Sequence, residues 1–85
     1  MTLNRTPRND GFVATFSRVE MKQFGGDARQ CIIRFHRDGS LDTVTNFWDC
    51  ATTINNSIAA DRALDAAERA LHARYTLPIF ERAAA

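Results

Sequence analysis

The chain has few of the residue types that mark specialised classes of protein. Its 85 residues include two cysteines, two prolines and a single lysine. No apolar run approaches the roughly 20 residues of a membrane span, and the first ten residues lack the apolar segment of a secretory signal. Two cysteines without such a signal favour reduced thiols over a disulfide framework. We therefore expect a cytoplasmic protein with no membrane segment.

Groups that carry catalysis or bind metals are also scarce. A nucleophilic catalyst needs a base beside it, and a zinc site needs about four ligands at characteristic spacing. The chain offers only two histidines and two well-separated cysteines: His36, His72, Cys31 and Cys50. The pair Gly25-Gly26 has no Lys-Ser or Lys-Thr behind it, so it does not match a phosphate-binding loop. The sequence predicts no enzyme, no metal site and no cofactor.

What remains is the composition of one small globular domain. The chain is 45% hydrophobic and 25% charged, which is ordinary for a folded protein. Its net charge of +1 is too balanced for a whole-molecule footprint on nucleic acid. The charge is uneven, because residues 1–40 carry seven basic and four acidic side chains, and residues 41–85 carry four basic and six acidic ones.

The clearest periodicity predicts a helix from Ser57 to Tyr75. Its apolar positions recur every three or four residues: Ala60, Leu64, Ala67, Leu71 and Tyr75. Ser57 suits an N-cap, and Pro78 forbids continuation, so the helix should end near Arg74 or Tyr75. Small alanines would let this helix lie close to a sheet.

Three strands are predicted upstream of the helix. The first opens at Gly11 and runs to Met21, with either a bulge near Ser17-Arg18 or partial cover on both faces, because the alternation changes parity there. The second, Gln30–Arg37, directs Cys31, Ile33 and Phe35 to one face. The third is Leu41–Trp48.

Two points of the strand layout stay open. A two-residue turn at Asp38-Gly39 would pair Ile33 with Val44, and a three-residue turn would pair Ile33 with Thr45. Residues 49–56 could continue the third strand or cross to the helix. The predicted fold class is α+β: a three-stranded antiparallel meander with one C-terminal helix on one face. Residues 1–10 would be a flexible arm, 11–80 the single domain, and 81–85 a disordered tail.

One helix covers only one face of such a sheet, so the other face is the leading candidate for a binding surface. The second strand places Ile32, Arg34 and His36 there. Basic residues in or next to the first two predicted strands, and the aromatic residue at the end of the third, complete the candidate set: Arg18, Lys22, Arg37 and Trp48. Phe47 and Trp48 point to opposite faces of a strand, so one of them is either packed elsewhere or held for a partner.

Two resemblances suggest functions for this layout. The stretch IIRFHRDGSLDTVTNFWD, followed by the helical AADRALDAAERAL, is similar to the three-strand-plus-helix DNA-binding modules of phage integrases and AP2-type domains. That resemblance implies nucleic-acid binding through the sheet. In size and layout the whole chain also resembles small phage or mobile-element proteins, including anti-CRISPR inhibitors. This resemblance implies a protein that binds a host complex and blocks it.

We therefore expect a non-catalytic protein-interaction module of the phage-inhibitor type, which would occlude a host protein complex such as a CRISPR-Cas effector. A nucleic-acid-binding domain is the alternative. A homodimer also stays open, because the exposed sheet face and edge strands could pair across a two-fold axis.

Overall fold

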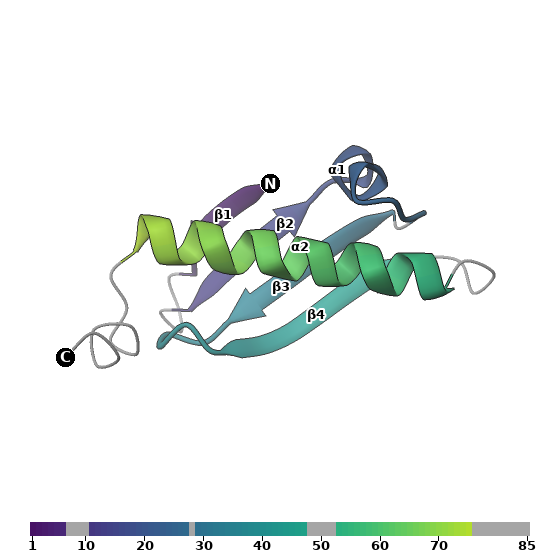
Figure 1. The fold of residues 1–85 in the computed structure, drawn as a ribbon. Coiled ribbons are helices and arrows are strands. Elements are labelled where there is room, and N and C mark those ends of the chain that lie inside the picture. The colour runs from purple at the N-terminus through teal and green to yellow at the C-terminus, as the bar shows by residue number, and fades with distance from the viewer. Residues whose placement is uncertain (7–10, 28, 48–52, 76–85) are drawn as a thin grey trace.

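The computed structural model describes residues 1–6, 11–27, 29–47 and 53–75 (Figure 1). The four strands form one antiparallel sheet in the order β1-β2-β3-β4. The elements follow the chain as β1 (Thr2–Arg5), β2 (Phe12–Phe16), α1 (Arg18–Gln23), β3 (Gln30–Phe35), β4 (Leu41–Phe47) and α2 (Thr53–Arg74). The α+β class, the antiparallel sheet and the C-terminal helix are confirmed, but the sheet has four strands where the sequence predicted three.

The additional strand comes from the segment predicted to be a flexible arm. Thr2–Arg5 pairs with β2, with Leu3 opposite Ala14. The prediction is wrong here because a single apolar residue gives no periodicity, yet Leu3 is only 5% exposed and belongs to the core. Residues 7–10 of the predicted arm, and the predicted tail at 81–85, lie outside the described residues.

The first predicted strand is also shorter than expected, because it turns into a helix. Arg18–Gln23 is α1, and the change of parity near Ser17 marks this transition, not a bulge. The Ser17 hydroxyl accepts a hydrogen bond from the Glu20 backbone N–H, and the Glu20 carboxylate accepts one from the Ser17 N–H. This reciprocal capping box satisfies two otherwise unpaired donors. It also turns Met21 into the core, where it is fully buried.

Helix α2 begins at Thr53, one turn before the predicted Ser57 cap, and ends at Arg74 as predicted. Its buried stripe consists mainly of alanines, namely Ala59, Ala60, Ala63 and Ala67, followed by Leu71. Leu64 and Tyr75, which the periodicity assigned to this stripe, are only half-buried. Because alanine side chains are short, the helix backbone can lie close to the sheet.

The start of α2 holds the connection between α1 and β3. Asn56 is fully buried, and its Oδ1 accepts a hydrogen bond from the Asp27 N–H. Arg62 Nη1 donates to the Phe24 carbonyl at 2.8 Å. A Cβ added at Gly26 would lie 2.7 Å from the Ala59 Cβ. Gly26 is therefore a point of close contact between the α1–β3 connection and helix α2.

The β3–β4 connection has the first of the two predicted registers, but its turn differs from the turn predicted for either. Ile33 lies opposite Val44, as a two-residue turn would require. However, the His36 N–H donates to the Ser40 carbonyl at 2.8 Å, which closes a three-residue turn. The two are reconciled by a bulge: Arg34 pairs with Thr43 and Phe35 with Leu41, which leaves Asp42 as the extra residue in β4.

The core lies between the sheet and α2. Cys31, Ile33 and Phe35 of β3 are buried there, as the alternation predicted, together with Phe12 and Phe16 of β2. Figure 1 shows α2 crossing one face of the sheet, with α1 beside the end of β2. Among the described residues, no helix has both the length and the apolar character to cross a membrane.

Candidate functional site

The sheet face opposite α2 is the candidate binding surface, and we call it the open face. The strand registers place two rows of side chains on it. One row runs across the four strands as Thr2, Thr15, Ile32 and Thr45, and the other as Asn4, Val13, Arg34 and Thr43. Gln30 lies beyond the first row, in the same alternation along β3. No described helix covers this face (Figure 1).

The open face carries one positive charge and is otherwise made of uncharged side chains, many of which can form hydrogen bonds. Val13, Thr15 and Ile32 in its centre are half-buried, and its other members are exposed. Arg34 is the single charged side chain among these nine residues, and none of them is a carboxylate. The face therefore offers an apolar centre, a surround of hydroxyl and amide groups, and one guanidinium that presents five donors in a planar fork.

The structure divides the predicted basic set into separate groups. Arg34 lies on the open face, and His36 and Arg37 follow it in the exposed β3–β4 turn. Arg18 and Lys22 are exposed on α1, which follows the end of β2 opposite the start of β3. The turn residues and the α1 residues are separated by the length of β3, which is roughly 16 Å at about 3.3 Å per residue. They therefore lie at opposite ends of the sheet. Trp48 lies outside the described residues.

The turn end of the face has its own local electrostatics. His36 Nε2 lies 3.8 Å from the Asp42 carboxylate, and both side chains are largely exposed. The Asp38 carboxylate accepts hydrogen bonds from the Ser40 hydroxyl and N–H, at 2.6 and 2.8 Å. These bonds hold the pKa of Asp38 below its ordinary value, since they stabilise the ionised form. The turn that carries Arg37 is therefore held in a defined conformation at one end of the sheet.

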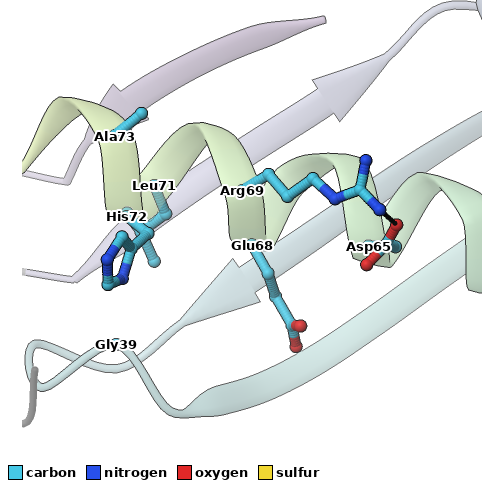
Figure 2. Close-up of a pocket in the computed structure, with 7 residues that line it drawn as sticks. All are labelled: Gly39, Asp65, Glu68, Arg69, Leu71, His72 and Ala73. Atoms are coloured by element: carbon cyan, nitrogen blue, oxygen red, sulfur yellow. Dashed lines mark ion pairs between the residues drawn. The ribbon is translucent and has the colours of Figure 1, made fainter. Parts of the chain in front are cut away.

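A groove on the other side of the molecule is the second candidate. It has a volume of about 500 Å³ and lies between α2 and the β3–β4 turn, with Leu71 and Gly39 in its lining. Figure 2 shows the charged side chains of α2 along this groove, with Arg69 paired to Asp65 at 2.9 Å. Both members of that pair are more than half exposed. Alternating charges of this kind are typical of a helix face in contact with solvent, and we interpret this side of α2 in that way.

Within the described part of the chain, no group of three or more His, Cys, Asp or Glu side chains is placed to hold a metal ion. Cys31 is fully buried, and burial raises its pKa to about 11, so the nucleophilic thiolate is rare at neutral pH. Cys31 is thus part of the hydrophobic core.

Comparisons with protein-family models, with curated proteins and with solved structures gave no match. The physical properties of the open face therefore carry the functional inference.

Sequence reasoning found part of this face and missed part. The parity of β3 correctly separates Ile32 and Arg34 from the buried Cys31 and Ile33. The contribution of β1 could not be predicted, because the strand itself was not recognised. The threonines of β4 were recognised as strand residues, but their face depended on a register that the sequence left open.

Proposed function

We propose that this protein is a non-catalytic protein-interaction module that binds a partner protein through the open face. In this proposal it acts in the cytoplasm as a phage-type inhibitor, and it occludes a host complex such as a CRISPR-Cas effector. The observation that carries the protein-binding part is the composition of the face: an apolar centre, hydrogen-bonding surroundings and one guanidinium. The inhibitor part rests on the resemblance in size and layout to small phage inhibitors.

The charge of the face favours a protein partner over a phosphate backbone. Protein interfaces combine an apolar centre with a polar rim and are enriched in arginine. Ile32 and Val13 supply such a centre, and Arg34 lies beside Val13 across the β2–β3 pair. Nucleic-acid surfaces instead gather many cations, and the open face holds one.

The size of the face argues that its flanks take part. Four strands spaced about 4.8 Å apart and five residues at about 3.3 Å each cover roughly 300 Å². A standard protein interface covers about 800 Å² on each partner. The footprint therefore extends to both ends of the sheet, where the turn presents His36 and Arg37 and where α1 presents Arg18 and Lys22.

Nucleic-acid binding through the same face is the second candidate, because the described residues of the face include no carboxylate and Arg37 adds a cation at its end. Its salt dependence can be estimated. Two phosphate contacts, by Arg34 and Arg37, give a log–log slope of about −1.8. Raising the salt from about 50 to about 200 mM then weakens binding only about twelvefold. That is far from the losses seen for proteins that contact six to ten phosphates.

The deciding experiment captures partners on the immobilised protein from a bacterial lysate, with and without nuclease, at both salt concentrations. Captured complexes are then retested with purified components, including a panel of CRISPR-Cas effectors whose target binding is measured directly. The proposal expects a protein partner that survives nuclease treatment and the higher salt. Capture that nuclease abolishes would instead support the nucleic-acid reading.

A further inference from the structure

The two edges of the sheet differ in whether their outward backbone groups are satisfied. Along a strand, successive residues direct their N–H and C=O groups to alternate sides. The Thr6 N–H donates to the Gly11 carbonyl at 2.8 Å, so Thr6 is turned towards β2. By alternation Asn4 and Thr2 also face β2, and Leu3 and Arg5 direct their backbone groups to the outer edge of β1.

This β1 edge is short and partly closed by the end of α2. Arg74 Nη1 donates to the outward Leu3 carbonyl at 3.0 Å. The Arg5 guanidinium lies over the rings of Phe12 and Tyr75, 5.2 and 5.3 Å from their centroids. With only four residues and an occupied carbonyl, β1 is a poor template for another strand.

The β4 edge has none of this protection in the described part of the chain. The His36–Ser40 hydrogen bond turns His36 towards β4, so alternation along β3 also turns Arg34 and Ile32 that way. Their partners are Thr43 and Thr45, which leaves Val44 and Asn46 directing their backbone groups outward. Among the described residues, no hydrogen bond reaches the outward backbone groups of Val44. The strand is seven residues long and contains neither lysine nor proline.

We propose that the outer edge of β4 pairs with β4 of a second copy of this chain, antiparallel across a two-fold axis at Thr45. In this register Val44 of each copy lies opposite Asn46 of the other, and each of these two pairs exchanges two backbone hydrogen bonds. Thr45 then faces its own counterpart in a non-hydrogen-bonded position, with Cα atoms about 4.5 Å apart. The two sheets become one continuous sheet of eight strands.

Three features favour a second copy over an unrelated strand. The register uses only the two residues whose backbone groups point outward. It places threonine against threonine on the open face, which is a favourable cross-strand pair. It also keeps like charges apart, because Asp42 lies three residues from the axis in each copy. The Asp42 residues of the two copies are then roughly 20 Å apart, which exceeds the screening length of about 8 Å.

The strength of this contact is modest. Four backbone hydrogen bonds and a narrow strip of side chains bury far less surface than a standard interface of about 1,600 Å². We therefore expect a reversible, concentration-dependent dimer with a dissociation constant in the micromolar range or weaker. The open face stays available, since the pairing uses the edge of the sheet.

The first test is sedimentation velocity of the full chain from micromolar to millimolar concentrations. Thr45→Asp places two carboxylates against each other at the axis and should weaken dimerisation about tenfold or more. Thr2→Asp is the matched control, because Thr2 lies in the same row at the opposite edge, and it should leave the dimer unchanged. A wild-type monomer throughout the range overturns the proposal, and so does equal weakening by both substitutions.

The second test fixes the register by disulfide formation in a Cys50→Ser background. Two Thr45→Cys residues would meet at the axis within disulfide reach, whereas two Thr43→Cys residues would be roughly 13 Å apart, beyond the about 7 Å limit. Cys31 is buried and stays unreactive. Faster crosslinking of Thr45→Cys supports the proposal. Equal rates, or faster crosslinking of Thr43→Cys, would show that the copies do not pair in this way.

Discussion

The contact between Gly26 and α2 makes a sharp prediction about stability. An alanine Cβ at this position would lie 2.7 Å from the Ala59 Cβ and 2.8 Å from Asn56 Oδ1. Carbon atoms in favourable contact are about 3.5–4.0 Å apart, so the loop and the helix must separate by about 1 Å. Overpacking of this kind costs about 1–3 kcal/mol. In a domain of this size each kcal/mol lowers Tm by about 4–8 °C.

Urea denaturation of Gly26→Ala, monitored by circular dichroism, measures this loss. The second substitution Ala59→Gly removes one of the two clashing partners, so the double variant should lose about 1 kcal/mol less than the sum of the single losses. Gly25→Ala is the matched control, because Gly25 has φ of +93° and only an ordinary contact at 3.5 Å. Its strain, about 1–2 kcal/mol, comes from the left-handed backbone, and Ala59→Gly should not relieve it.

This reasoning is refuted if Gly26→Ala is as stable as wild type. It is also refuted if Ala59→Gly rescues both glycine variants equally. Either result would mean that α2 does not approach the α1–β3 connection as closely as the distances indicate.

Three further predictions concern single side chains. Asn56→Ala should lower the free energy of unfolding by about 1–3 kcal/mol in urea titrations, because the buried amide is the acceptor for Asp27 N–H; a neutral result would contradict that role. An NMR titration should give Asp38 a pKa below its ordinary value of 3.8, and Ser40→Ala should raise that pKa. The ionised Asp38 stabilises the fold above pH 3.8, and this contribution is lost as the pH falls through the lower pKa of the folded state. The thiol of Cys31 should resist alkylation in the folded protein, and fast alkylation of the native state would contradict its burial. The buried neutral thiol contributes fully to stability below pH 9.0, and this contribution should decline as the pH rises towards about 11.

Periodic segments were predictable from the sequence, and short ones were not. β3 and most of α2 repeat their pattern over enough residues for the buried side to be read directly. The six-residue α1 has too few turns for a period, although its capping pair, Ser17 followed by Glu20, was a local sign of a helix start. β1 carries one buried residue, and its place depends on long-range contacts such as that of Arg74 with Leu3.

The candidate site was predicted in part for the same reason. Arg34 follows from the parity of β3 alone. The positions of Arg18 and Lys22 depend on whether the chain continues as a strand or turns into α1, and the helix moves them to the far end of the sheet. The pairing of Thr45 depends on the bulge at Asp42, which the turn residues do not reveal.

The most direct test of the central claim compares two arginine substitutions in binding to the captured partner. Arg34→Glu reverses the single charge on the open face, and Arg69→Glu makes the same change beside the groove on α2, where the side chain is 79% exposed. Removing one partner of a hydrogen-bonded charge pair that is buried in an interface costs about 2 kcal/mol or more. With Arg34 in such a pair at the centre of the contact, we expect Arg34→Glu to weaken binding at least about thirtyfold. Arg69→Glu should bind like wild type. Undiminished binding by Arg34→Glu, together with loss of binding by Arg69→Glu, would place the interaction on the helix side and contradict the claim.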